Sequence, residues 1–173
     1  TFDSNSNKVV VAYRDVGNSN YGTAVVGTVS GTGITYGTPV VFEGAGVNFI
    51  TATFDSNENK VVIAYRDDAN SDYGTAIVGT VSGTAISFGT AAVFESAEAG
   101  DCSATFDSDS NKVVVAYKDA GNSNYGTAVV GTVSGTSISF GTPVVYESAT
   151  TESCAATFDS NSNKVVIAYK DGG

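Results

Sequence analysis

The chain repeats itself every 52 residues, with no insertion or deletion between the copies. Phe-Asp-Ser begins at Phe2, Phe54, Phe106 and Phe158, and Asn-Lys-Val-Val follows at the same distance in every copy. The period divides the chain into three full units (1–52, 53–104 and 105–156) and the first part of a fourth (157–173). Because a unit this small cannot bury an apolar face alone, we expect each unit to pack against its neighbours in a single array.

Each unit contains four stretches rich in Val, Ile, Thr, Tyr and Phe, which favour strands. In the second unit they cover residues 52–56, 60–67, 73–82 and 86–95, separated by turn-forming residues at 57–59 and 82–84. No stretch has the 3.6-residue period of an amphipathic helix. The sequence therefore predicts an all-β fold with four antiparallel strands per 52-residue repeat.

Residues 61–65, Val-Val-Ile-Ala-Tyr, are apolar at successive positions, which predicts a strand buried on both faces, as in sheets stacked face to face. Together with Phe54-Asp55 and the polar turn, this stretch resembles the inner two strands of YVTN-type and sialidase-type β-propeller blades. More distantly, the tandem units resemble repeats of secreted adhesins and phage tail proteins. The resemblance implies propeller blades. A β-solenoid or a string of small sandwiches is the alternative. Closed propellers have about 4–8 blades, so we expect a piece of a longer protein, a ring shared by several chains, or an open array.

The chain is acidic, with a net charge of −10 and a pI near 4.1. Such a surface repels phosphate groups, so nucleic acid and anionic membranes are poor partners, and we expect neither nucleic-acid binding nor membrane insertion. No apolar run is long enough to span a bilayer. The acidity suits either solubility or divalent cations.

All eight basic residues occupy two positions of the unit, represented by Lys8 and Arg14. The second of these positions accepts Arg or Lys, so we expect a structural ion pair with an Asp or Glu between neighbouring units. Seven acidic residues stand outside the repeated pattern and are expected on exposed loops: Glu58, Asp68, Asp72, Glu98, Asp101, Asp109 and Glu152.

The loop between the second and third strands carries the candidate ligand-binding residues. In a propeller this loop shares a rim with the links between units (43–51, 95–103 and 147–155), which we expect to be loops as well. Asp, Asn and Tyr can hydrogen-bond sugar hydroxyls, and a Tyr ring can stack on a sugar. The alternative is ordinary turn chemistry with a packed Tyr. The candidates are Asp15, Asn18, Asn20 and Tyr21, then Asp67, Asn70, Asp72 and Tyr73, then Asp119, Asn122, Asn124 and Tyr125.

Two further features have both a chemical and a structural interpretation. The turns at Asp3 and Asp107 have some of the oxygen ligands of a calcium loop but lack its glycine and bidentate acid, so a hairpin turn is favoured over a calcium site. Cys102 and Cys154 lie one period apart; they suit either a disulfide between units or two small buried hydrophobes. With no His and two Cys, the chain by itself offers no zinc site.

Catalysis has little support, because no Ser-His or Cys-His couple is possible without His. Near-identical units also supply the same groups repeatedly, whereas a catalytic site needs different groups in different roles. We therefore predict a non-enzymatic binding module at a cell or virion surface, with a glycan as its ligand and no cofactor. The alternative is a structural repeat that assembles with itself, either as a homo-oligomer or within a longer chain, and a glycoside-acting enzyme is a remote third.

Overall fold

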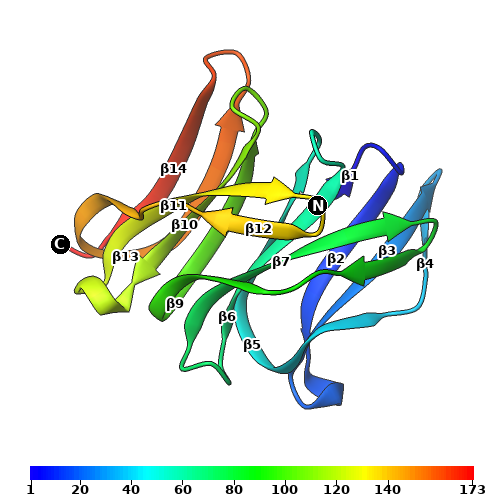
Figure 1. Ribbon diagram of the computed structural model, residues 1–173, viewed down its shortest axis with the longest axis horizontal. Coiled ribbons are helices and arrows are strands. Elements are labelled where there is room, and N and C mark those ends of the chain that lie inside the picture. Colours follow the sequence, from blue (N-terminus) through cyan, green and yellow to red (C-terminus); the bar gives the residue numbers. More distant parts are fainter.

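The structure, a computed structural model, describes all 173 residues and contains 14 strands and two short 3₁₀ turns (Figure 1). The predicted all-β fold is confirmed. No helix has the length and apolarity needed to span a bilayer. The strands are β1 (Phe2–Asp3), β2 (Lys8–Asp15), β3 (Tyr21–Ser30), β4 (Gly33–Tyr36), β5 (Val40–Asp55), β6 (Lys60–Asp67), β7 (Tyr73–Ser82), β8 (Ala85–Phe88), β9 (Ala92–Asp107), β10 (Lys112–Asp119), β11 (Tyr125–Ser134), β12 (Ser137–Phe140), β13 (Val144–Asp159) and β14 (Lys164–Asp171).

The strands form one continuous antiparallel array that does not close on itself. Its order is β1-β2-β3-β5-β6-β7-β9-β10-β11-β13-β14, and the short strands β4, β8 and β12 pair with β3, β7 and β11. The long strands β5, β9 and β13 each pair with one sheet through their first half and with the next sheet through their second half. The links between units, expected to be loops, are therefore strand.

A bulge inside each long strand allows this change of partner without a break in the chain. The pairing of β5 with β6 shifts between Asn48 and Thr51, and Phe49 there has a φ of 49°. Asp101 and Ser153 take the same left-handed conformation in β9 and β13, with φ of 48° and 53°. A bulky residue is uncommon at positive φ, so nothing in the sequence marks the position in the way that a glycine would.

The core lies between the units, because consecutive sheets pack face to face. All five residues 61–65 of β6 are fully buried, as predicted from their unbroken apolar run. Val61, Ile63 and Tyr65 pack toward the first unit, whereas Val62 and Ala64 pack toward the third. Alternate side chains of β6 thus point into two different interfaces, one with each neighbouring sheet, which explains why the strand has no polar face.

The repeated acid of the fourth strand accepts a hydrogen bond from the next unit at every junction. Tyr65 Oη donates to Glu43 at 3.1 Å, Tyr117 Oη to Glu95 at 2.9 Å and Tyr169 Oη to Glu147 at 2.8 Å. Burial raises the pKa of the Tyr65 and Tyr117 phenols, and the neighbouring carboxylates raise it further. These phenols therefore stay protonated and act as donors.

Glycines permit close backbone contact between adjacent units. A Cβ on Gly89 would collide with the carbonyl oxygen of Thr136 in the next unit, and Gly37 meets Thr84 in the same way. At the equivalent Gly141 the nearest atom is the oxygen of Val130 at 3.7 Å, an ordinary contact. The repeat thus has a glycine at all three equivalent positions, but a following unit contacts only Gly37 and Gly89 closely enough to require one.

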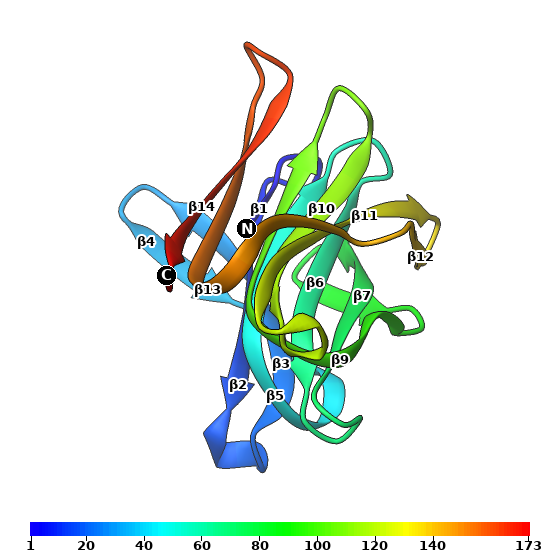
Figure 2. The ribbon, with the colours of Figure 1, turned by 90° about the vertical axis from the view of Figure 1, so that its left-hand side faces the viewer.

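The two ends of the array leave apolar faces open. Val11, the equivalent of the fully buried Ile63 and Val115, is 37% exposed, and Ile34 is 42% exposed where Ile86 is 5% exposed. At the other end, Val130 and Val166 are 47% and 49% exposed. Figure 2 shows the tip of the β13–β14 hairpin standing apart from the other hairpins. The same sequence is therefore core inside the array and surface at its ends.

The hairpins that carry the Asp3-type turns all lie along the upper edge in Figure 1. In each, one carboxylate oxygen accepts hydrogen bonds from two backbone N–H groups, as Asp55 does from Asn57 and Glu58 at 2.9 and 3.0 Å. Asn59 and its equivalents close the turn at positive φ. This is the predicted hairpin geometry, and Gly83 provides the positive φ of the next reversal, also as predicted.

Candidate binding rim

The candidate loops lie along the lower edge in Figure 1, opposite the Asp-capped hairpins. In the first and third units each begins with a 3₁₀ turn, η1 (Val16–Asn18) and η2 (Ala120–Asn122). Two residues at positive φ then reverse the chain, as Ser19 and Asn20 do with φ of 55° and 64°. Asn, Asp and Ser tolerate this conformation better than most residues, which accounts for the Asn-Ser-Asn and Asn-Ser-Asp strings.

The three repeated acids of these loops do not have the same environment. Asp67 and Asp119 are buried, and each accepts a hydrogen bond from the backbone of its own loop, at 3.2 Å from Asn70 N and 3.1 Å from Asn122 N. Asp15 is partly exposed and makes no such bond. Asp67 and Asp119 thus shape their loops, and Asp15 alone has a carboxylate free of the loop backbone.

The amide and phenol groups of the loops are more accessible. Asn18, Asn70 and Asn122 are exposed, and Tyr21, Tyr73 and Tyr125 are half-buried in all three units. Asn20 and Asp72 are partly buried, and Asn124 is exposed. The structure therefore places one exposed amide and one partly covered phenol at the same position in every full unit.

Backbone hydrogen bonds join each loop to the bulged stretch of the neighbouring long strand. Asn20 O accepts from Val47 N at 3.3 Å, Asp72 O from Ala99 N at 3.2 Å, and Asn124 O from Thr151 N at 3.0 Å. The loops and the bulged stretches 46–51, 98–103 and 150–155 therefore form one continuous edge, which we call the rim. The prediction that the loops and the inter-unit links share one rim is confirmed, although the links are strand.

The densest polar cluster of the rim surrounds Arg66. Its guanidinium bonds to Asp68 at 3.1 Å and Glu98 at 2.9 Å, and Asp72 lies 3.3 Å away. The Phe49 ring lies over the same guanidinium, 5.1 Å from its centroid, and is 40% exposed. This arrangement is a cation–π contact at the boundary of the first two units.

Asn48 connects this cluster to the first unit. Its side-chain oxygen accepts a hydrogen bond from Arg14 Nη1 at 2.9 Å, and its nitrogen donates to both carboxylate oxygens of Asp68 at 3.0 and 2.7 Å. Arg14 thus bonds to an amide rather than to the Asp or Glu expected from the sequence, because Asn48 occupies the position that faces it.

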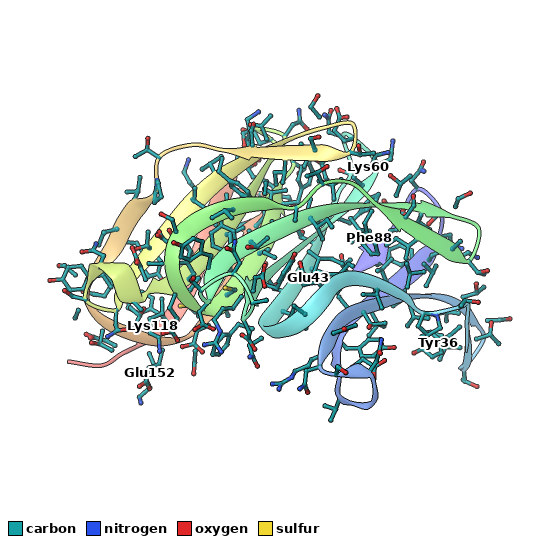
Figure 3. All side chains as sticks on the ribbon, turned by 60° about the horizontal axis from the view of Figure 1, so that its bottom comes forward. Tyr36, Glu43, Lys60, Phe88, Lys118 and Glu152 are labelled. Carbon is teal, nitrogen blue, oxygen red and sulfur yellow. The ribbon has the colours of Figure 1, made fainter.

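The equivalent lysines pair with the bulged stretches of their own sheets. Lys118 Nζ lies 3.9 Å from Asp101, and Lys170 Nζ lies 2.6 Å from Glu152, which lowers the pKa of the Glu152 carboxyl and raises that of Lys170. Figure 3 shows Lys118 and Glu152 at one edge and Lys60 at the opposite edge. Five of the seven acids outside the repeated pattern therefore form ion pairs with the cation at the Arg14 position of a unit, which is Arg66, Lys118 or Lys170. These acids are Asp68, Asp72, Glu98, Asp101 and Glu152.

The cysteines are both free thiols in the structure. Burial raises the pKa of Cys102 to about 12, and the sulfur of Cys154 lies 3.1 Å from Tyr146 Oη. Neither belongs to a metal site: no group of three or more His, Cys, Asp or Glu side chains is close enough to hold an ion. The one pocket of the molecule lies beside β2, lined by Thr1, Val9, Val10, Val11, Ala12, Ile50, Thr51 and Ala52, and it contains no acidic or basic side chain.

Of the cluster around Arg66, Asp72 is among the candidate residues, but Phe49, Asn48 and Arg66 are not. A comparison of what the copies share leads to Tyr21 and its equivalents, whereas Phe49 and Asn48 occur in a single copy. The signal that finds it is the position at which the copies differ. No protein-family model and no curated protein matches this sequence.

Proposed function

We propose that the chain is a non-enzymatic binding module that holds a carbohydrate along its rim. The observation that carries the proposal is the recurrence, in every full unit, of an exposed amide (Asn18, Asn70, Asn122) beside a half-buried phenol (Tyr21, Tyr73, Tyr125). Amide and phenol groups bond to hydroxyls, and the apolar ring supports the face of a sugar. Three such positions on one edge favour a polymeric ligand, since several weak contacts then add in avidity.

We further propose that the units are blades of a β-propeller. Two features support this assignment: the sheets stack face to face through apolar surfaces, and each chain segment passes from the outer part of one sheet to the inner part of the next. Open apolar faces at both ends are what an unclosed set of blades presents. A surface location, outside a cell or on a virion, suits a glycan ligand.

Replacement of Tyr21, Tyr73 and Tyr125 by Ala together tests the binding function. Retention in native gels that contain a neutral polysaccharide should fall for the triple variant, with the circular dichroism spectrum unchanged. Tyr36→Ala is the matched control, because Tyr36 is 55% exposed on β4, away from the loops. Absence of retention by the unmodified chain on a broad glycan array, or equal retention by the triple variant, would refute the proposal.

The open end faces favour a second function, assembly of the chain with copies of itself. Val11 and Val130 are exposed here, although their equivalents Ile63 and Val78 are fully buried by a neighbouring unit. A head-to-tail contact of this kind generates a ring or a filament. Light scattering in dilute solution should then give a mass above the 17.5 kDa of one chain. A folded chain that stays monomeric across a wide concentration range would exclude it.

A further inference from the structure

The differences between the units are concentrated in one short segment. Residues 46–51 read Gly-Val-Asn-Phe-Ile-Thr, 98–103 read Glu-Ala-Gly-Asp-Cys-Ser, and 150–155 read Thr-Thr-Glu-Ser-Cys-Ala, with no position shared by all three. Elsewhere no more than two adjacent positions differ between units. Copies that share a framework so closely but differ in one segment present a different chemical surface at that segment.

This variable segment coincides with the bulged stretch of the rim. Phe49, Asp101 and Ser153 occupy the same position of the unit and have the same left-handed backbone. Phe49 contacts Arg66 and Asp101 contacts Lys118, whereas in the third unit Lys170 pairs with Glu152, the residue before Ser153. The backbone is therefore constant while the side chain changes from an aromatic ring to a carboxylate to a hydroxyl. Only the first of these can stack on a ligand ring.

The first segment places Phe49 among groups suited to a polyol. Asn48 donates to Asp68 within the cluster, and Asp68, Asp72 and Glu98 surround the guanidinium of Arg66. Phe49 keeps 40% of its surface exposed although Arg66 covers part of the ring. An exposed aromatic surface bordered by hydrogen-bonding side chains combines apolar support with polar selection.

The charges of the cluster indicate which saccharides it accepts. The guanidinium groups of Arg14 and Arg66 are outnumbered by the carboxylates of Asp68, Asp72 and Glu98. Arg66 already bonds to these acids, and Arg14 is engaged by the side-chain oxygen of Asn48, so the cluster keeps a net negative charge, as does the protein as a whole with its charge of −10. Anionic sugars are disfavoured on both counts.

From these observations we infer that the rim does not bear three equal sites: the junction at Phe49 is its principal saccharide-binding site, and the ligand is a neutral sugar. The inference rests on the proposed function of the rim. The loops with Tyr21, Tyr73 and Tyr125 then add weaker, similar contacts along the polymer, and the variable segments decide where along the rim binding is strongest.

Two substitutions with opposite expected effects on binding test the inference. Binding is measured in affinity gels, with galactomannan as the neutral probe and alginate as the anionic probe. Phe49→Ala should weaken galactomannan binding about tenfold, the loss expected for one aromatic contact of roughly 1.4 kcal/mol. Ser153→Phe places an aromatic side chain on the same backbone conformation in the third unit and should strengthen binding. Tyr36→Ala is the control for loss of an exposed aromatic, and alginate should not retard any of the variants.

The outcomes separate the inference from the function it rests on. Retention of the unmodified chain that falls in the triple Tyr variant but not in Phe49→Ala would overturn the principal site and leave the rim function standing. Preference for alginate would overturn the neutral ligand. No retention on either polymer or on a broad glycan array would remove the rim function, and the site with it. Circular dichroism of each variant ensures that a loss reflects binding rather than unfolding.

Discussion

Replacement of Tyr117 by Phe removes one hydroxyl from a fully buried junction of the array. Tyr117 is 0% exposed, and its Oη donates to Glu95 Oε2 at 2.9 Å. Its ring also packs on Phe94 with centroids 5.2 Å apart, and Phe would keep that contact. The substitution thus isolates the hydrogen bond from the packing.

The expected cost follows from the charge of the acceptor. A hydrogen bond to a charged group contributes about 1.5–3 kcal/mol, and Glu95 is only half-buried, so we expect about 2 kcal/mol at neutral pH. In a chain of this length that lowers the melting temperature by about 4–8 °C. Urea titration followed by circular dichroism measures the free energy of unfolding directly.

The loss should depend on pH in a defined direction. Burial raises the pKa of the Glu95 carboxyl above its usual value of 4.5, and the bond from Tyr117 opposes this rise. A raised pKa means that the folded state holds the proton more tightly, so this group's contribution to stability falls as the pH rises above 4.5 toward the folded-state pKa. Without the hydroxyl the pKa rises further, so Tyr117→Phe should cost more at pH 8 than at pH 4.

The same substitution at the exposed end of the array is the control. Tyr169 makes the equivalent bond to Glu147 but is 37% exposed, so Tyr169→Phe should cost clearly less. Equal losses at the two positions, or a Tyr117→Phe loss that does not increase with pH, would refute the reasoning.

Three further predictions compare equivalent positions in different units. Ile63→Ala should cost about 2–5 kcal/mol, because it leaves a cavity in a fully buried site, whereas Val11→Ala on the open face should cost far less; similar losses in urea titrations would contradict the assigned core. Gly89→Ala should destabilise the chain by about 1–3 kcal/mol through its collision with Thr136 O, while Gly141→Ala should have little effect, and thermal melts of the two variants decide. In a Cys154→Ser chain, the remaining Cys102 thiol should react with a disulfide reagent at pH 8 on the order of tenfold to a hundredfold more slowly than a free thiol, since desolvation raises its pKa to about 12 while the greater nucleophilicity of its thiolate offsets part of the loss; reaction as fast as that of a free thiol would contradict the raised pKa.

The strands and the buried faces could be predicted because both depend on short-range sequence. The bounds expected for β6 and β7 match the structure, since apolar β-branched runs end at strong turn signals there. The unbroken run 61–65 also indicated correctly that sheets stack on both sides. The expected strand 86–95 is instead split at Gly89, and its second part begins β9.

The links and the cluster at Phe49 could not be predicted, for two physical reasons. The bulge at Phe49 depends on a left-handed backbone in a residue that seldom adopts it, so the segment reads as a loop although both its flanks pair as strand. The cluster joins Arg14, Asn48 and Arg66, which come together only when two sheets stack. The loops with Tyr21 were found because their chemistry is local and repeated.

Because β5, β9 and β13 are each shared between two sheets, the part of the chain that unfolds cooperatively is larger than one 52-residue repeat. Each is hydrogen-bonded into two sheets at once, so one sheet cannot melt without withdrawing half of a strand from the next. Local openings should therefore spread from the ends, where β2 and β14 lack a covering neighbour, rather than start in the middle. Amide exchange would then be graded along the array, fastest at its ends and slowest in β6, even though the sequence of every copy is nearly the same.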